Sequence, residues 1–426
     1  MINRRLTAAE AADLLGVKPA TLYAYVSRGL LPREKGAQGS SFDPRDVALL
    51  ARSGRTRPDG PTAEPDRVVH RGGRAPGAQT TEPLFVTELT LIDGGHLFYR
   101  GLDAVQLSRT RSFEEVAGWL WGGDWPDPGE VWSASPTAAD AVDAALKAVP
   151  SGARPLERFM LAVLVAGLSD DLRHDLTGAS VPVIGKSIIS LFAWTLEQGR
   201  RGRGGTGDEP NGGSIADRVW RALSPLPPTP QRVSVLDAAL VLSADHELAP
   251  STMAARVAAS FRADPYAVVS TGLGPASGSW AAGSTGAPSE VELMLEDCLA
   301  MGVERAVGER LRRTGSVPHG FGMPLYQEGD PRGGELLVRL DEVGGSSERH
   351  DVVRKVVDLA EERGFPPANV DLGLGALSFC AEMPGESGQA VATLAKVAGW
   401  LAHALEEYAN PSRFRSRAYY VGQRPG

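Results

Sequence analysis

Three ionisable residues in the second half of the sequence are of types that can move protons or hold anions. His246 lies in the run Ala-Asp-His-Glu, Arg332 ends the run Asp-Pro-Arg, and Asp371 ends the run Asn-Val-Asp. An imidazole or a carboxylate can transfer a proton, and a planar guanidinium pairs with a carboxylate through two parallel hydrogen bonds. Each residue also has an ordinary structural interpretation: Asp371 as a capping residue after a proline pair, and His246 as a structural histidine. Taken singly, none of them defines a site.

The chain around these residues is predicted to be almost entirely helical. A short strand-like run at 85–92 and an Asp-Gly-Gly turn are followed by apolar repeats of helical period, separated by glycine and proline. The predicted helices are 113–122, 136–149, 155–168, 185–198, 233–243, 250–261, 290–313, 346–363 and 387–408. Because so few strands are expected, the sequence predicts an all-α fold for this large body.

The composition is that of a soluble globular protein with more than one domain. The 426 residues are 42% hydrophobic and 23% charged, and the net charge is −8. This balance argues against a surface coated with nucleic acid, but it allows one basic module. No run approaches the roughly 20 apolar residues of a membrane span, and the N-terminus has no signal-peptide core, so we expect a cytoplasmic protein. Cys298 and Cys380 lack metal-ligand spacing and are predicted to be reduced thiols.

Residues 1–52 are predicted to form a small helical domain of their own. Thr7 and Glu10 have the spacing of a capping box at the start of the first helix, and Gly16 marks its end. Pro19 then lies near the start of a second helix, because proline is favoured in the first turn.

The second helix of this domain is predicted to turn one face outward. Leu22 and Val26 point inward, which leaves on the outer face Thr21, Tyr23, Tyr25 and Arg28. The basic, glycine-containing run 33–41 suits a β-wing, and an Asp-Pro pair at 43–44 opens a third helix.

Two stretches are too polar to belong to a core. Residues 53–82, rich in glycine, proline, arginine and threonine, are predicted to be a flexible linker. Residues 199–214 contain few apolar side chains and are predicted to be a disordered surface insertion. The body then comprises residues 83–426.

Several stretches of the body, taken in order, resemble the citrate synthase family. They are Phe-Tyr-Arg-Gly-Leu-Asp at 98–103, Ala-Asp-His-Glu at 244–247, Gly-Phe-Gly at 320–322, Asp-Pro-Arg at 330–332, Asn-Val-Asp at 369–371, Gly-Trp-Leu-Ala-His at 399–403 and Tyr-Val-Gly at 420–422. Each is short, but their order matches the family over nearly the whole body, from about residue 85 to 422.

The resemblance implies a two-lobed helical body, in which a small lobe at roughly 285–385 closes over the substrate, and an obligate homodimer. In this family an acyl-CoA is deprotonated at its α-carbon, and the enolate attacks the keto carbon of oxaloacetate or a related 2-oxo acid. Acetyl-CoA or another acyl-CoA would be the substrate or ligand in a citrate- or methylcitrate-type condensation. The resemblance implies no permanently bound cofactor and no metal.

The resemblance also assigns roles to the three ionisable residues. Asp371 matches the family's catalytic base, and His246 matches a histidine that contacts the keto acid. Arg332 matches an arginine that binds a substrate carboxylate, which suits its planar fork of donors.

Further binding residues follow from the same resemblance. Lys396 stands where a second substrate-binding arginine is usual; it keeps the charge but loses the fork. Arg415 matches the arginine that crosses into the partner's site, with Arg417 as the alternative. The segment that lies against the coenzyme's adenine corresponds to Gly320, Phe321 and Gly322.

Two histidines of the family pattern are missing. Ala281 replaces the histidine that stabilises the enolate, and Met323 replaces the one that polarises the ketone. Neither side chain can donate a hydrogen bond, and the loss of one such donor typically costs about 10²–10³ in turnover. Two other sources of a donor stay open: His319 from a reshaped loop, or backbone N–H groups around residues 277–282. The sequence therefore predicts a weakened site.

The N-terminal domain resembles the MerR-like winged helix-turn-helix group. The resemblance lies in Ala-Ala-Asp-Leu-Leu-Gly-Val at 11–17 and the following run from Thr21 to Leu30. It implies DNA binding, with the second helix in the major groove and basic wing residues near phosphates. The alternative is a protein-docking module, because one fold serves both roles.

Three functions therefore stay open. The first is a citrate synthase-like enzyme with weakened activity. The second is a DNA-binding regulator whose body senses an acyl-CoA or a carboxylic acid, and the third is a partner subunit of an active paralogue. The retained Asp371, His246 and Arg332 favour the first, and the two missing histidines favour the others.

Overall fold

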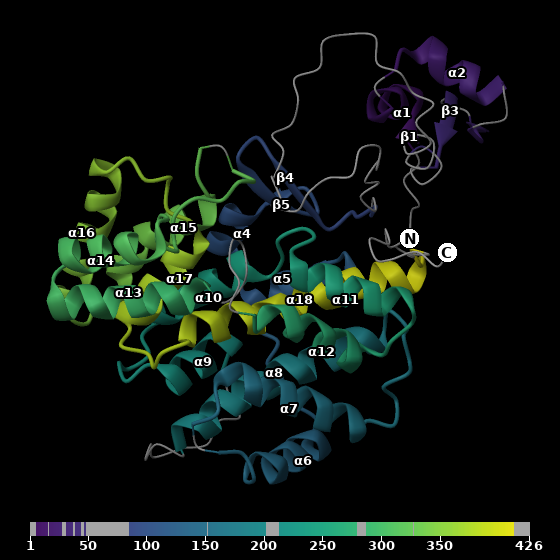
Figure 1. Cartoon of the computed structure of the whole chain (residues 1–426). Coiled ribbons are helices and arrows are strands. Elements are labelled where there is room, and N and C mark those ends of the chain that lie inside the picture. The colour runs from purple at the N-terminus through teal and green to yellow at the C-terminus, as the bar shows by residue number, and fades with distance from the viewer. Residues whose placement is uncertain are drawn as a thin grey trace, which may run out of the picture. The chain divides into compact units, whose positions relative to one another are not determined.

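The computed structural model describes residues 6–15, 17–27, 31–36, 39–43, 47, 85–150, 152–201, 213–278, 287–326 and 328–412. The chain divides into two compact units, Met1–Val86 and Thr87–Gly426 (Figure 1). The predicted linker, 53–82, lies outside the described residues.

The N-terminal unit consists of two short helices and a small antiparallel sheet. Its elements are β1 (Leu6–Thr7), α1 (Ala8–Leu14), α2 (Pro19–Ser27), β2 (Glu34–Gly36) and β3 (Gly39–Phe42), with the strand order β1-β3-β2. The predicted capping box is confirmed, because the Glu10 N–H donates to Thr7 Oγ1 and the Thr7 N–H donates to Glu10 Oε2. The predicted wing is confirmed as the β2–β3 hairpin. The predicted third helix, apart from Val47, lies outside the described residues.

The core of this unit corrects one predicted residue. Tyr25 does not lie on the outer face of α2, since its side chain is only 7% exposed. It follows the fully buried Leu22 by three residues, and helical periodicity puts both on the inner face, in one cluster with Phe42. Tyr23 is exposed and Thr21 half-buried, whereas Arg28 lies outside the described residues.

The body begins with a three-stranded antiparallel sheet and continues as helices. The strands are β4 (Thr90–Asp93), β5 (His96–Tyr99) and β6 (Leu102–Asp103). The helices are α4 (Ala104–Thr110), α5 (Phe113–Gly122), α6 (Pro136–Leu146), α7 (Pro155–Leu168), α8 (Ser180–Arg201), α9 (Ile215–Leu223), α10 (Pro230–Ser243), α11 (Pro250–Ser260), α12 (Pro265–Ala276), α13 (Ala287–Met301), α14 (Val303–Thr314), α15 (Pro331–Val338), α16 (Ser347–Glu362), α17 (Val370–Cys380) and α18 (Ser387–Ala409), with a 3-10 turn at Leu340–Val343. The all-α class is confirmed.

The predicted helix limits are correct where caps are explicit and wrong where a glycine intervenes. Helices α5 and α7 have the predicted limits, 113–122 and 155–168. The predicted single helix 290–313 is two helices, because Gly302 has φ +88 and divides α13 from α14. Helix α8 extends to Arg201, so the segment predicted to be a disordered insertion from residue 199 begins as helix; residues 202–212 lie outside the described part.

The last helix, α18, is the centre of the body. It packs against α5, α8, α10, α11, α12, α13 and α17, and it runs through the middle of the helical layers (Figure 1). Most of its length is buried on every side, and Trp400 is among the largest side chains with no exposure. A helix held on all sides is a rigid support for any functional side chain that it carries.

Helices α13 to α17 gather at one end of the body (Figure 1). Within this group α17 packs against α13 and α15, and α14 packs against α13 and α16. Helices α13 and α17 also contact α18, so the group meets the rest of the body along the central helix.

Both cysteines are buried free thiols, as predicted. Burial raises the pKa of Cys298 to about 11 and that of Cys380 to about 12, so both stay protonated at neutral pH. Among the described residues, none of the helices has the length and apolar character needed to cross a membrane.

Candidate active site

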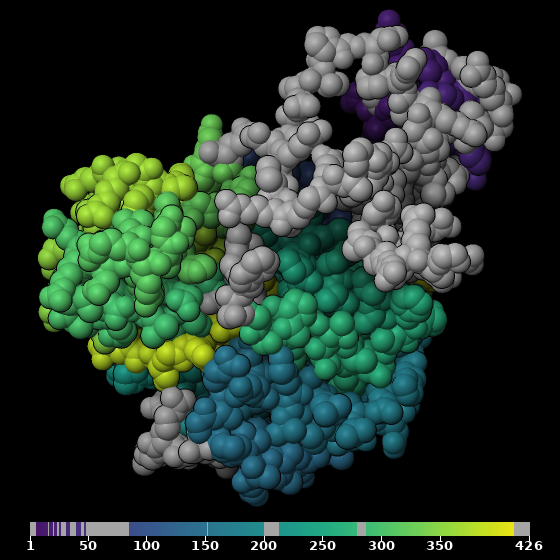
Figure 2. Space-filling view, in the orientation of Figure 1, coloured from purple at the N-terminus to yellow at the C-terminus, as the bar shows by residue number. Residues whose placement is uncertain are grey.

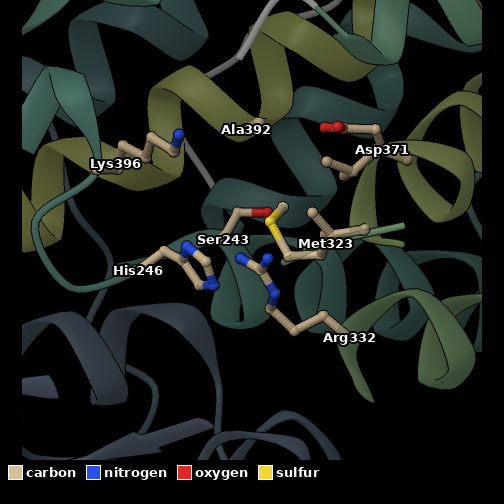
Figure 3. Close-up of a pocket in the computed structure, with 10 residues that line it drawn as sticks. Ser243, His246, Met323, Arg332, Asp371, Ala392 and Lys396 are labelled. Carbon is tan, nitrogen blue, oxygen red and sulfur yellow. The ribbon is translucent and has the colours of Figure 1, made fainter. Parts of the chain in front are cut away.

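A single pocket brings together four of the five residues predicted to act in catalysis or substrate binding. It lies where α10, α15, α17 and α18 meet, and its lining residues are Ser243, His246, Ala249, Met323, Arg332, Val370, Asp371, Leu374, Ala392 and Lys396 (Figure 3). These residues are spread along the chain from residue 243 to residue 396. The fold, not the local sequence, therefore assembles the site.

The carboxylate of Asp371 enters this pocket from the first turn of α17. The helix cap is Asn369, whose Oδ1 accepts the N–H groups of Asp371 and Leu372. The structural interpretation of Asp371 as a cap is therefore wrong, and its side chain lines the pocket instead. Burial raises the pKa of Asp371 to about 7, although the charges of Arg332 and Lys396 lower it. A carboxyl group with this pKa can both accept and donate a proton near neutral pH.

The turn at Gly320-Phe321-Gly322 is bonded directly to the start of α17. Gly320 and Gly322 have φ values of +98 and +77, which explains the two glycines. The Gly320 carbonyl accepts the Asn369 N–H at 2.9 Å, and the Gly322 carbonyl accepts Asn369 Nδ2 at 2.9 Å. These bonds fix the next residue, Met323, in the same pocket as Asp371.

Met323 therefore occupies the wall of the pocket, and among the described residues of this loop no other side chain lines the pocket. His319, the alternative source, is exposed and does not line the pocket. Ala281 and the backbone around it, residues 279–286, lie outside the described residues, as do Arg415 and Arg417.

The guanidinium of Arg332 has an internal partner that the sequence did not predict. Its Nε and Nη2 donate to the two carboxylate oxygens of Asp330 at 2.9 and 2.8 Å. Asp330 also accepts the Val370 N–H at 3.1 Å, so it ties α15 to α17. Burial lowers the pKa of Arg332, but the charge of Asp330 more than offsets this and the net shift is upward. The fixed cation still has three of its five N–H donors for a ligand.

His246 is held by a tyrosine from the same loop as Met323. Its Nε2 lies 2.9 Å from the hydroxyl of Tyr326, and both side chains are buried. Burial, together with the charges of Arg332 and Lys396, holds the pKa of His246 well below its usual range. The imidazole is therefore neutral, with one donor and one acceptor nitrogen.

Lys396 reaches the pocket from α18, one helical turn after Ala392. Burial and the charge of Arg332 lower the pKa of its amine to about 8, against the opposing effect of Asp371 and Asp245. Within the described part of the chain, no carboxylate lies within 4 Å of its Nζ. The Lys396 amine therefore lacks a direct ion-pair partner among the described residues and faces the pocket in which a ligand would bind.

The hydroxyl of Ser243 is a site group that the sequence did not indicate. It is buried at the end of α10, lines the pocket, and has no hydrogen-bond partner among the described residues (Figure 3). An unpaired buried hydroxyl costs free energy unless a ligand or water satisfies it. Nothing in the serine-poor run Leu-Val-Leu-Ser distinguishes this residue before the fold is known.

Behind the pocket, a buried network of polar side chains holds Asp245, the residue that precedes His246. The carboxylate of Asp245 bonds to Thr90 Oγ1 and to His403 Nε2, at 2.5 and 3.2 Å. His403 Nδ1 in turn lies 2.8 Å from Arg256, which donates to Glu407. Gly399 makes the approach of Asp245 to α18 feasible, since a Cβ there would lie 2.4 Å from its Oδ1.

The site as a whole suits acid–base chemistry on an anionic substrate. It combines a carboxyl group with a pKa of about 7, a neutral imidazole, a buried arginine and a lysine, on supports of packed helix. Within the described residues there is no cluster of three or more potential metal ligands.

Comparisons with known proteins agree with this class of site. A family model for the citrate synthase C-terminal domain matches residues 80–417, and a helix-turn-helix model matches residues 5–41. The citrate synthase of Haloferax volcanii is 31% identical over 358 residues, which cover 79% of this chain and 93% of that protein. The citrate synthase of Synechocystis is 27% identical over 374 residues, which cover 80% and 89%. The chain belongs to the citrate synthase family and carries a helix-turn-helix domain at its N-terminus.

Solved structures share the fold of the body. The citrate synthase of Thermoplasma acidophilum, solved with carboxymethyl coenzyme A and oxaloacetate, has a TM-score of 0.68 at 22% identity and covers 81% of this chain and 95% of its own. The citrate synthase of Thermotoga maritima has a TM-score of 0.65 at 23% identity, with coverage of 81% and 95%.

Proposed function

We propose that the pocket binds an acyl-CoA together with oxaloacetate or a related 2-oxo acid and condenses them slowly. The observation that carries this proposal is the meeting of Asp371, His246, Arg332 and Lys396 in one pocket whose remaining wall includes Met323. Asp371 would remove the α-proton of the acyl group, and its pKa of about 7 suits that role. The two cations and the Ser243 hydroxyl would bind the oxo acid.

The same pocket explains why the condensation is expected to be slow. Met323 offers sulfur and methyl groups where a donor would have to polarise the ketone, and Ala281 has no donor for the enolate. Each absent donor costs about 10²–10³ in turnover, and such losses overlap when the groups act together.

Thiol release tests the condensation directly. Purified protein with acetyl-CoA or propionyl-CoA and oxaloacetate is expected to release CoA thiol several orders of magnitude more slowly than the typical enzyme turnover of about 10 s⁻¹. Omission of oxaloacetate is the control for simple hydrolysis. Fast turnover would contradict the weakened site, whereas a total lack of oxaloacetate-dependent release with ligands still bound would favour a sensor or a partner subunit.

We further propose a homodimer through the layer of helices α7, α8, α11 and α12. Helices α6 to α8 form one face of the body (Figure 2). Leu164 and Leu168 lie one turn apart on α7 and are 59% and 71% exposed, and Leu172 beyond them is 73% exposed. Phe261, at the end of α11, is 75% exposed. Large apolar side chains with this degree of exposure favour an association surface here. In such a dimer Arg415 would reach the partner's pocket.

Sedimentation measures this assembly. The unmodified chain is expected to sediment as a dimer, and Leu168→Glu is expected to shift it toward a monomer because the charge would be buried in the interface. The matched control is Val338→Glu, at a residue that is 78% exposed on α15 in another part of the body. A monomeric unmodified chain would rule the dimer out.

A regulatory function is the second candidate, and the helix-turn-helix domain favours it. Tyr23 is exposed on α2, and the guanidinium of Arg33 lies 6.0 Å from its ring centre, which makes an aromatic and cationic surface. We propose that this surface contacts DNA and that the pocket senses an acyl-CoA or a carboxylic acid.

Gel shifts with DNA from upstream of the protein's own coding sequence test this role. We expect retardation at low salt that weakens as salt rises, because phosphate contacts release counterions. Tyr23→Ala is expected to weaken binding, while Tyr23→Phe, which keeps the ring, should retain most of it. If no fragment is retarded at low salt, a protein-docking role replaces the DNA role.

A further inference from the structure

The amine of Lys396 has a setting that a simple carboxylate-binding cation does not need. It lies on the central helix α18, and its side chain points into the pocket toward the carboxylate of Asp371 (Figure 3). No carboxylate of the described chain lies within 4 Å to neutralise it. The charged groups that affect its amine are Arg332 on α15, Asp371 on α17 and Asp245, which follows α10. The neutral imidazole of His246 lines the same pocket.

Lysine and arginine differ chemically in a buried pocket, because only the lysine amine can become an uncharged nucleophile. An uncharged amine adds to a carbonyl carbon, and lysines are activated for this by desolvation or by a second cation nearby. Lys396 has both, and its pKa of about 8 leaves roughly one tenth of the amine uncharged at pH 7.

We propose that Lys396 forms an iminium with the keto carbon of a 2-oxo acid that carries a 3-carboxylate, and that the pocket thereby decarboxylates this acid without acyl-CoA. The oxo acids concerned are of the oxaloacetate class. The inference rests on the proposed function in one respect, namely that such an acid binds between Arg332 and Lys396.

The first half of the reaction forms the iminium. The uncharged amine adds to the keto carbon, and the carbonyl oxygen leaves as water after it takes one proton from the nitrogen and one from the Asp371 carboxyl. Nitrogen is then doubly bonded to carbon and carries the positive charge. With a pKa of about 7, Asp371 is available in the protonated form that this step requires.

The second half releases carbon dioxide. The bond between C3 and its carboxylate breaks, its electron pair forms the C2–C3 double bond of an enamine, and nitrogen becomes neutral. Asp371, reprotonated from solvent, gives its proton to C3, and water hydrolyses the resulting iminium to the shortened 2-oxo acid and the free amine. Overall one proton is consumed and one carbon dioxide is released, without any oxidant or reductant.

The apolar part of the pocket favours this second half. Met323, Val370, Leu374 and Ala392 line it beside the charged residues. A carboxylate against such a wall loses part of its hydration, which raises its free energy relative to neutral carbon dioxide. Met323 stands where the family pattern has a histidine, and this replacement is expected to weaken condensation. The same apolar side chain is expected to assist loss of the carboxylate.

Reductive trapping with oxaloacetate as the probe tests the iminium. Full-length protein is incubated with oxaloacetate and sodium cyanoborohydride, with a chelator present and acyl-CoA absent, and digested for mass spectrometry. We expect a reduced three-carbon adduct on the peptide that contains Lys396, with a yield that is highest between about pH 7 and 8, because the step needs both the uncharged amine and the protonated Asp371 carboxyl. Pyruvate release, followed with lactate dehydrogenase, is expected above the rate in buffer.

Two variants make the result specific. Lys396→Arg keeps the charge but cannot form an iminium, so it should lose the adduct and lower pyruvate release at least about tenfold. Lys355→Met removes an exposed lysine on α16 and should change neither quantity. Equal trapping on Lys396 and Lys355, or an unchanged rate of pyruvate release in Lys396→Arg, would overturn the inference.

Thermal shift with oxaloacetate separates this inference from the proposed function. If oxaloacetate raises the melting temperature but no adduct forms, the iminium is wrong and the binding proposal stands. If oxaloacetate neither binds nor forms an adduct, both are wrong. Lys396→Arg is included in the same measurement, since retained stabilisation shows that its pocket is still folded.

Discussion

The double substitution Ala281→His with Met323→His is expected to raise oxaloacetate-dependent thiol release from acetyl-CoA by about 10²–10⁴-fold. One imidazole would serve as donor to the enolate and the other as donor to the ketone, and each donor of this kind contributes about 10²–10³. The position of residue 323 is favourable, because the preceding Gly322 is bonded to Pro367 and Asn369 beside Asp371. Each single substitution is expected to give much less than the pair, because the two donors act on one transition state.

Met323→Leu is the matched control for this gain. It preserves an apolar side chain of similar volume in the same wall and adds no donor, so its thiol release should stay at the level of the unmodified chain. The gain should also depend on oxaloacetate and on an acyl-CoA with an α-proton. If the double variant binds oxaloacetate normally but gains nothing, the slow condensation has another cause and the assignment of positions 281 and 323 is wrong.

The helices that the sequence predicted well are those with explicit end signals and one apolar face. Helix α5 starts after a capping box of Ser112 with Glu115 and ends at Gly122, before the cap residue Gly123 with φ +83, and its limits were predicted without error. Helix α17 was missed as a helix although it carries Asp371. Its eleven residues are buried on all sides, so apolar periodicity gives no signal, and Gly373 and Gly375 are there because neighbouring helices leave no room for a Cβ.

The candidate site divides in the same way between what motif order can predict and what only the fold reveals. The order of the sequence motifs identified Asp371, His246, Arg332 and Lys396 as candidate site residues. All four line the pocket. The motifs could not reveal that Arg332 Nε and Nη2 donate to the carboxylate of Asp330. Hydrogen bonds between side chains depend on how α15 meets α17. The error at Tyr25 has a simpler origin: alternate residues of a helix do not share a face, and Leu22 already defined the inner one.

Asp371→Asn is expected to lower thiol release by about 10²–10⁴-fold, because asparagine cannot accept the α-proton. The effect is best measured in the double-histidine background, where the rate is large enough to fall. In the chain with Asp371 intact, the rate should increase as pH is raised through about 7, since the carboxylate is the active form. Asp237→Asn is the matched control: Asp237 is half-buried and its pKa is also raised to about 7, but it accepts the Phe113 N–H and does not line the pocket.

The same substitution should stabilise the fold, which distinguishes loss of a base from loss of structure. The Asp371 pKa rises from 3.8 in the unfolded chain to about 7 in the folded one, so the folded state holds the proton more tightly. Stability therefore decreases as pH is raised from about 4 to 7, by up to about 4 kcal/mol from this group alone. Asp371→Asn removes that cost, so urea unfolding should show a gain at pH 8 that fades toward pH 4, where Asp371 is protonated in both states. A variant that loses activity and is less stable at pH 8 would indicate that Asp371 is a structural residue, and the catalytic assignment would fail with it.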